Sequence, residues 1–333
     1  MYSNKASYIP GTEIRWTGRI DSETDFDSFR WHQFVKSVNL NNLPACAKLE
    51  TYCLIGFACD KGVERNVGRV GAALAPRLIR EQLANLPVYF SSEVCLFDAG
   101  DILCPNSLEE AQEMLANAVY DLLSAGYFPV VLGGGHETAY GHYSGLRKFF
   151  GTNIPGIVNL DAHFDIRPYP NGGTSGSMFN QIADDCANAG LPFNYFVAGI
   201  QQSANTKALF KYAHELKIKY ILARNMVTHN ESWDDALDDF LKVNSKLYLT
   251  VCADVFAASF APGVSAPQPF GLHPELGLAF IKKIVRSGKL VSFDIAEVSP
   301  RFDNDALTAK LAAIIVFAVL NTLHNPNSNL VID

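Results

Sequence analysis

The sequence of 333 residues has no surplus of basic residues, no apolar leader and no apolar run long enough to cross a bilayer. Its net charge of −7 and the lack of an Arg/Lys-rich tail argue against nucleic-acid and anionic-membrane partners. The N-terminal stretch MYSNKASYIPGTEIRW has no signal-peptide core. Near the C-terminus, the longest apolar run, residues 311–320, is about half of the ~20 residues that a spanning helix needs, so it predicts a buried helix.

Cysteine occurs without a disulfide or zinc pattern. The number of cysteines is odd and no CxxC is present, so the sequence indicates neither a disulfide framework nor a Cys-type zinc site. Most lie in apolar runs, as small buried side chains do, so we predict a reducing, cytoplasmic compartment. The cysteines are Cys46, Cys53, Cys59, Cys95, Cys104, Cys186 and Cys252.

Apolar runs alternate with helical patterns after a polar, aromatic N-terminal arm (residues 1–45), in which we expect one short helix. With 48% hydrophobic and 18% charged residues, the chain can bury a large core. The runs are continuous rather than alternating, which is typical of parallel strands buried on both faces, and they predict one α/β domain over residues 46–333. No GxGxxG opens the first strand-to-helix turn, which disfavours dinucleotide binding. The predicted strands are 51–58, 92–97, 128–132, 154–160, 193–199, 218–223, 246–251 and 290–295. The predicted helices are 74–85, 108–125, 138–150, 203–216, 231–242, 273–287 and 305–323.

The run 154–160 ends in three possible metal ligands within five residues, Asp161, His163 and Asp165. On an extended backbone their alternation would point all three side chains to one face. Carboxylate beside imidazole suits Mn, Fe or Zn better than Ca. The other interpretation is a strand end whose carboxylates cap a loop.

Polar residues also follow three other predicted strands, at the carboxyl ends where open α/β sheets bind ligands. His136 follows a triple glycine, Cys252 and Asp254 follow residues 246–251, and Glu297 follows residues 290–295. Six candidate ligands at three strand ends, with Glu297 at a fourth, favour a metal site over coincidence. Five of the six, all except Cys252, are firm metal ligands. One metal with open coordination positions usually takes fewer, so the five predict two metals about 3.5 Å apart. We predict structural or solvated roles for His32, His142, His214, His229 and His273.

Four motifs in this order, GGGHE, NLDAHFD, TVCADVF with APGVSAP, and DIAEVSP, resemble the ureohydrolase superfamily of arginases, agmatinases and formimidoylglutamases. The resemblance runs from about residue 51 to 323. The GRID and RWHQ segments, GGGHE and HFDIRP are most similar to the formimidoylglutamases. The resemblance implies a three-layer α/β/α sandwich around an eight-stranded parallel sheet. It also implies two Mn²⁺ per subunit, and a homo-oligomer is possible in this superfamily.

The resemblance implies a set of metal ligands, and this chain departs from the superfamily at one of them, position 252. His136, Asp161, Asp165 and position 252 would hold one ion, whereas Asp161, His163, position 252 and Asp254 would hold the other. The superfamily usually has Asp where this chain has Cys252. A thiolate can bind metal, because the metal lowers the pKa of the thiol, and we favour this interpretation. The alternative is a buried thiol that leaves one ion poorly held.

The activity implied by the resemblance is hydrolysis of N-formimidoyl-L-glutamate to L-glutamate and formamide by a metal-activated hydroxide, in histidine degradation. Asp165 would carry the proton and Glu297 would bind the cationic amidine. Arg167 is the first candidate for binding a substrate carboxylate, with Asn66 and Arg69 as weaker ones. Ser175 lies in a segment, residues 172–181, that is similar to the superfamily's substrate loop. The histidine that shuttles protons in arginases has no counterpart, because no His occurs between residues 164 and 213.

Two other functions stay open. One is another ureohydrolase, acting on agmatine or guanidinobutyrate; Arg167 disfavours it, because a buried cation would repel the amine of agmatine. The other is a non-catalytic, metal-depleted relative, which Cys252 would allow.

Overall fold

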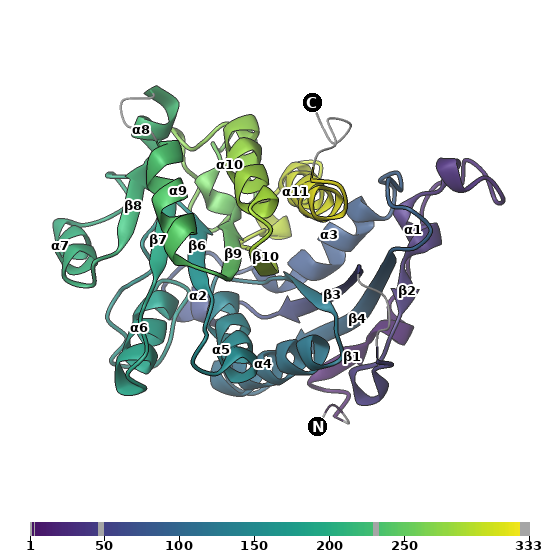
Figure 1. Ribbon diagram of the computed structural model, residues 1–333, viewed down its shortest axis with the longest axis horizontal. Coiled ribbons are helices and arrows are strands. Elements are labelled where there is room, and N and C mark those ends of the chain that lie inside the picture. The colour runs from purple at the N-terminus through teal and green to yellow at the C-terminus, as the bar shows by residue number, and fades with distance from the viewer. Residues whose placement is uncertain (1, 3, 46–49, 229–232, 327–333) are drawn as a thin grey trace.

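The fold is organised around one ten-stranded sheet, seen in a computed structural model that describes residues 2, 4–45, 50–228 and 233–326. Eight neighbouring strands, β3 to β10, all run parallel, in the order β4-β3-β5-β10-β9-β6-β7-β8 (Figure 1). They lie at the eight predicted positions, which confirms the α/β class. Their bounds are β3 Thr51–Ala58, β4 Cys95–Leu103, β5 Phe128–Leu132, β6 Gly156–Leu160, β7 Tyr195–Ile200, β8 Lys219–Leu222, β9 Leu247–Cys252 and β10 Leu290–Ala296.

The expected count of eight strands was wrong, because the N-terminal arm adds two more. β1 (Tyr8–Pro10) pairs antiparallel with β4, and β2 (Lys36–Ser37) pairs with β4 in parallel. Without them β4 would be an edge strand with unpaired backbone groups, and such edges are usually covered. The arm also contains the expected short helix, α1 (Trp31–Phe34). Its aromatic residues pack against the main core: Trp16, Phe26, Phe29, Trp31 and Phe34.

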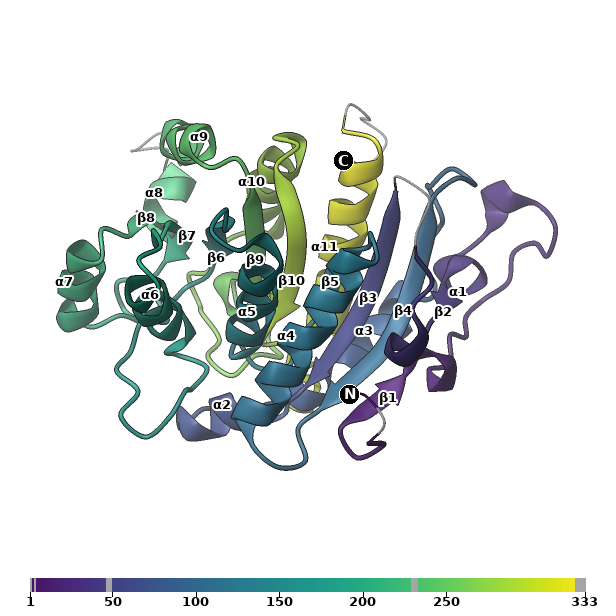
Figure 2. The same ribbon diagram turned by 60° about the horizontal axis from the view of Figure 1, so that its bottom comes forward.

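Helices cover both faces of the sheet, giving three layers (Figures 1 and 2). Alternate strand residues point to opposite faces, so that Leu54 and Val130 join one core cluster while Ile55 and Val131 join the other. The first cluster contains residues of α3, α9, α10 and α11, and the second contains residues of α4, α5, α6 and α7. The helix bounds are α2 Lys61–Arg65, α3 Ala75–Leu83, α4 Leu108–Ser124, α5 Thr138–Phe150, α6 Met178–Asn188, α7 Lys207–Glu215, α8 Ala223–Thr228, α9 Trp233–Val243, α10 Pro274–Arg286 and α11 Leu307–His324.

The seven predicted helices are present, α5 with the predicted bounds and the other six with shifted ends, but α2, α6 and α8 were missed. α6 begins inside residues 172–181, the segment that the sequence assigns to a loop. The predicted start of α4 is confirmed, since Ser107 accepts a hydrogen bond from the backbone N–H of Glu110 at 3.1 Å. The predictions made for Cys46 and for His229 concern residues outside those that the structure describes.

α11 alone among the described helices is long and apolar enough to cross a membrane. However, 72% of its apolar window is buried inside the protein, where it packs beside α3 and α10. It is therefore a helix of the protein core, as the sequence predicts for residues 311–320.

Candidate metal centre

The four strand ends that carry the candidate ligands lie next to one another. β5, β10, β9 and β6 are consecutive in the sheet and parallel, so their carboxyl ends meet at one edge. His136 follows β5, Asp161 follows β6, Cys252 ends β9 and Glu297 follows β10. Residues far apart in the sequence are thus brought together by the strand order alone.

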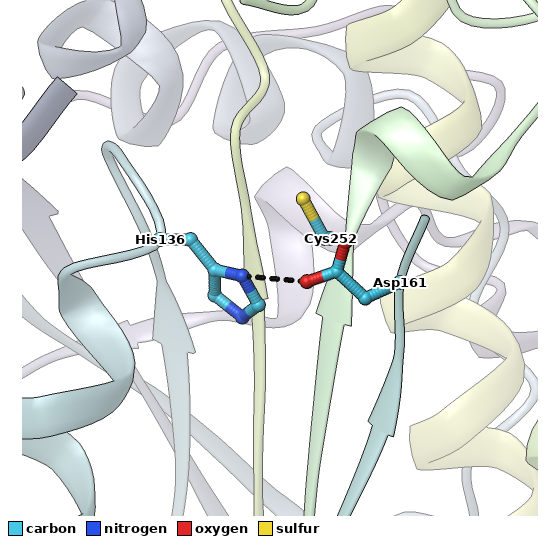
Figure 3. A group of neighbouring side chains, drawn as sticks. All are labelled: His136, Asp161 and Cys252. Atoms are coloured by element: carbon cyan, nitrogen blue, oxygen red, sulfur yellow. Dashed lines mark ion pairs between the residues drawn. The ribbon is translucent and has the colours of Figure 1, made fainter. Parts of the chain in front are cut away.

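Asp161 is the centre of this group, because its two oxygens face different histidines. Its Oδ2 lies 3.0 Å from Nδ1 of His136, and its Oδ1 lies 3.5 Å from Nδ1 of His163. Two groups of ligand atoms therefore share Asp161: one with His136 and Cys252, the other with His163 and Asp254. Within each group the ligand atoms lie within 4.8 Å of one another. Figure 3 shows the first group, with the Cys252 thiol beside the ion pair of Asp161 and His136.

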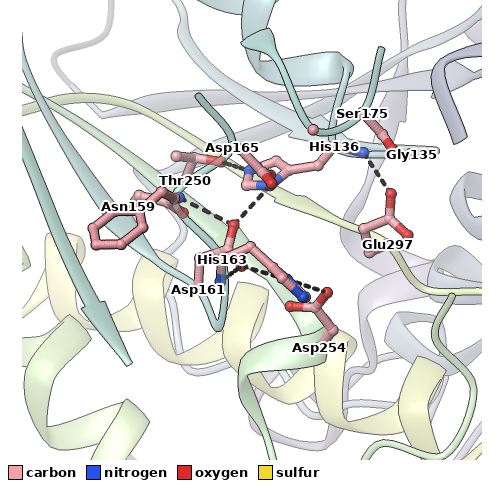
Figure 4. Close-up of polar contacts among 12 residues, drawn as sticks. Gly135, His136, Asn159, Asp161, His163, Asp165, Ser175, Thr250, Asp254 and Glu297 are labelled. Atoms are coloured by element: carbon pink, nitrogen blue, oxygen red, sulfur yellow. Dashed lines mark hydrogen bonds and ion pairs between the residues drawn. The ribbon is translucent and has the colours of Figure 1, made fainter. Parts of the chain in front are cut away.

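Asp165 and Asp254 complete the cluster. Oδ2 of Asp165 lies 3.0 Å from Nδ1 of His136, and Oδ2 of Asp254 lies 3.2 Å from Nδ1 of His163 (Figure 4). Among the described residues, Oδ1 of Asp254 is buried without a hydrogen-bond partner. A buried carboxylate oxygen without a donor is costly, and a cation would satisfy it.

The ligands do not gather in the way that the sequence predicted. β6 ends at Leu160, and the following five residues form an irregular loop rather than an extended strand. Asp165 has φ 51°, in the left-handed region that is unfavourable for a residue with a side chain. Asp254 likewise lies in a 3-10 turn, Ala253–Val255, beyond β9. The expectation of strict alternation was therefore wrong, because the chain must turn to bring ligands around a point.

The electrostatics of the cluster fit cations. Burial opposes charge on His136, but Asp161 and Asp165 outweigh it and raise the pKa of the imidazole well above its usual value. The pKa of His163 is raised in the same way, against burial, by Asp254 and Asp161. Burial and the charge of Asp161 raise the pKa of Asp165 to about 6. Without metal, protons on two imidazoles thus balance the carboxylates, and divalent ions would take over that role when those protons leave.

The metal-free protein should lose stability as pH rises from about 4.5 through neutral into the alkaline range. Burial, aided by Glu297, raises the pKa of Glu137 from 4.5 to about 8, so folding favours its protonated form and that stabilisation is lost as pH rises from 4.5 to 8. The ion pairs of His136 and His163 have the same sign, because their pKa values are raised and their stabilisation is lost at high pH. We expect the free energy of unfolding to fall by about 1.4 kcal/mol per pH unit for each such group, measured by denaturant titration of chelator-treated protein.

Glu137→Gln is the matched variant for that measurement. Oε1 of Glu137 accepts a hydrogen bond from the backbone N–H of Gly62 at 2.7 Å, and the amide oxygen of Gln can replace this acceptor. The stability of the variant should therefore fall less steeply with pH. A slope equal to that of the wild type would contradict the role given to Glu137.

A cavity of about 260 Å³ opens above the cluster. It is lined by five of the six candidate ligands, and by all four residues that the sequence suggested for substrate binding: Asn66, Arg69, Arg167 and Ser175. Nη1 of Arg167 donates to Oδ1 of Asn66 at 3.0 Å, and Nδ2 of Asn66 contacts Oγ of Ser175 at 3.4 Å. Arg167 forms no ion pair among the described residues, so its guanidinium is available to an anion.

Arg69 also faces the cavity, but its guanidinium is largely engaged. It donates to the carbonyl oxygens of Ser265 at 3.1 Å and Val264 at 2.6 Å, and it stacks on Phe302 at 4.2 Å. Ser265 in turn donates to Oε2 of Glu297 at 2.6 Å. Arg69 therefore holds the loop that orients Glu297, which is a different task from direct substrate binding.

Glu297 is fixed on both sides. Its Oε1 accepts the backbone N–H of His136 at 2.8 Å (Figure 4), while its Oε2 accepts the hydroxyl of Ser265. Burial raises its pKa to about 7, and its φ of 66° is another left-handed conformation. Backbone strain of this kind concentrates at functional sites. Ser265 was not singled out from the sequence, although its APGVSAP motif was the available signal.

Comparison with known proteins agrees with this arrangement. Residues 50–321 match the Arginase family. The chain is 51% identical over 329 residues to a formimidoylglutamase of Clostridium tetani, covering 95% of this chain and 96% of that one. A variant of the Trypanosoma cruzi formiminoglutamase, solved with Mn²⁺, is 25% identical, with a TM-score of 0.74 over 82% of this chain and 93% of that one. The formimidoylglutamase of Bacillus subtilis, at 23% identity, shares the fold with a TM-score of 0.78, covering 94% and 97% of the two chains.

Proposed function

The chain belongs to the Arginase family, and we propose that it hydrolyses N-formimidoyl-L-glutamate to L-glutamate and formamide in histidine degradation. The observation that carries the proposal is a pair of ligand groups sharing Asp161 at the floor of a cavity whose wall presents Arg167. The floor suits hydrolysis of an amidine, and the wall suits a substrate with carboxylates. The free cysteines Cys53, Cys59, Cys95, Cys104, Cys186 and Cys252 fit the cytoplasmic location that we also propose.

We propose that two Mn²⁺ ions bind in the cluster. One would be held by His136, Asp161, Asp165 and Cys252, and the other by Asp161, His163, Cys252 and Asp254. When bound, such a pair acts as a Lewis acid and lowers the pKa of water to near neutrality. The buried, unpaired oxygen of Asp254 and the two opposed oxygens of Asp161 support this assignment.

The protein's own groups would move the proton and hold the substrate. Asp165 can accept a proton from the attacking water and deliver it to the leaving nitrogen, so that the C–N bond breaks to give an amine and formamide. Glu297 can bind the cationic amidine by charge-assisted hydrogen bonds, since His136 and Ser265 already fix the direction of its carboxylate. Arg167 can grip a carboxylate of the glutamate part in a bidentate fork.

Product analysis tests the proposal. The Mn²⁺-loaded protein should release formamide and glutamate in equal amounts from N-formimidoyl-L-glutamate. Agmatine and guanidinobutyrate serve as controls, and urea release from either without formamide release would assign the chain to another ureohydrolase activity. A protein that held less than about one ion per chain and released neither product would be the non-catalytic relative.

Arg167→Met should weaken recognition of the substrate carboxylate. We expect kcat/KM for N-formimidoyl-L-glutamate to fall about 100-fold, because a charge-assisted bidentate contact contributes up to about 3 kcal/mol. Hydrolysis of formamidine, which has no carboxylate, should change less than about twofold. Arg167→Lys keeps the charge but loses the bidentate geometry. Its kcat/KM for N-formimidoyl-L-glutamate should therefore lie between that of the wild type and that of Arg167→Met. Equal losses with both substrates would assign Arg167 a structural role instead.

A further inference from the structure

We propose that Thr250 and Asp294 are positioning residues that hold the ring of His136 with Nδ1 directed at the metal centre. Both are fully buried in the sheet, outside the cavity and outside the proposed ligand set. The proposal rests on the proposed metal site, but it concerns metal binding rather than the identity of the substrate. It therefore holds or fails independently of the activity toward formimidoylglutamate.

The first step is the contact between His136 and Thr250. Nε2 of His136 lies 3.0 Å from Oγ1 of Thr250, on the side of the ring that points away from the ligand cluster (Figure 4). Oγ1 of Thr250 lies 2.5 Å from Oδ1 of Asp294 and donates its single proton there. Since that proton is committed, the hydroxyl oxygen can only accept from His136. Nε2 therefore carries a hydrogen, and Nδ1, beside Asp161 and Asp165, is the nitrogen left to a metal.

The second step is the rigidity of Asp294. Its other oxygen, Oδ2, accepts the hydroxyl of Tyr248 and lies 2.6 Å from Nδ1 of His142 on α5. His142 is held at its opposite nitrogen, Nε2, by Oγ of Ser292 at 2.5 Å. The carboxylate is thus fixed by three side chains and cannot turn away from Thr250.

The strand register explains how the hydrogen-bonded series from Asp294 through Thr250 to His136, which we call the relay, forms. Thr250 and Asp294 are direct partners in the β9–β10 ladder, and Tyr248 and Ser292 are the preceding pair on the same face. These four side chains point toward α5, into a layer that also contains many apolar residues such as Val131 and Ile157. Burying a carboxylate, an imidazole and three hydroxyls there costs more than packing apolar groups of similar volume. Such a cluster is expected where it orients a ligand, as the outer partners of metal-binding histidines do.

The other neighbours of His136 do not fix its ring as Thr250 does. Phe179 contacts the ring edge-on, with centroids 5.7 Å apart, and gives no hydrogen bond. The carboxylates of Asp161 and Asp165 both lie at Nδ1 and are themselves proposed ligands. Among the described residues, Thr250 is the one side chain that hydrogen-bonds to Nε2.

Thr250→Val tests the relay, because valine keeps the shape and removes only the hydroxyl. We expect Kd for one of the two Mn²⁺ ions to rise 10- to 100-fold, roughly the usual cost of losing an outer partner, while the second ion binds as in the wild type. Thr250→Ser restores the hydroxyl and should restore the affinity. Thr322→Val is the matched control: it removes a buried threonine hydroxyl from the last turns of α11, which carries no proposed ligand. Its Kd values should not change.

Calorimetric titration with Mn²⁺, together with the Tm of metal-free protein, separates positioning from stability. A Thr250→Val variant with a lowered Tm but wild-type Kd values for both ions would overturn the proposal. Asp294→Asn, alone and combined with Thr250→Val, provides the second test. If Asp294 acts through Thr250, Asp294→Asn should raise Kd at least about fivefold in the wild-type background. In the Thr250→Val background the same substitution should change Kd by less than about twofold. Independent, additive effects would also overturn the relay, whether or not formamide is released.

Discussion

Asp161→Asn should abolish binding of the metal pair and lower kcat at least about 1,000-fold. Asp161 is common to the two groups of ligand atoms that the structure brings together, whereas Cys252, proposed for both ions, lies in the first group. The two oxygens of Asp161 also face different histidines. An amide keeps the shape but can offer only one acceptor oxygen, and its NH₂ would face a cationic site. Three orders of magnitude correspond to about 4 kcal/mol of barrier, which is within what a metal pair contributes to hydrolysis.

The measurement combines elemental analysis of the Mn²⁺-loaded variant with its rate of formamide release. Asp185→Asn is a suitable control, because Asp185 forms a partly exposed ion pair with Arg147 on the protein surface. That variant should keep both ions and its full rate. If Asp161→Asn retained two ions, the shared position of Asp161 would have no functional meaning and the proposed ligand set would fall.

The central fold could be predicted because its strands are buried on both faces. A run such as TYCLIGFA, residues 51–58, is apolar after Thr51, and the observed β3 has the same bounds. β1 and β2 could not be found in this way, since they are three and two residues long and largely exposed or half-buried. Their existence depends on the free edge of β4, which is a tertiary feature.

The residue types of the candidate site could be predicted, whereas their geometry could not. Strand ends and ligand types are enough to point to His136 and Asp161. The left-handed backbone of Asp165 has no sequence signal, because a turn around an ion depends on the ligands it must bring together. Thr250 and Asp294 were also hidden, since 44 residues separate them and only the register of β9 and β10 makes them neighbours.

Cys252 is the residue on which the proposed metal pair is most open to test. Burial, and then Asp161 and the other carboxylates, raise the pKa of its thiol well above the usual value, so the metal-free protein holds it protonated. Its Sγ nevertheless lies in the same group of ligand atoms as His136 and Asp161. Binding through sulfur therefore requires that a metal displace the proton, and affinity should increase with pH.

Cys252→Ala should then lose one of the two ions and at least about 100-fold in kcat, because alanine removes one of the two donors, Asp161 and Cys252, that both ions are proposed to share. Cys252→Asp should keep both ions, and its preference for Mn²⁺ over Zn²⁺ should rise at least about tenfold, since a hard carboxylate replaces a soft thiolate. Competition titrations with the two metals measure both effects. If Cys252→Ala bound two Mn²⁺ as tightly as the wild type, the thiol would be a buried spectator. Asp161 would then be the one donor proposed for both ions. Cys252 could not then explain a metal preference that differs from that of a site with carboxylate in its place.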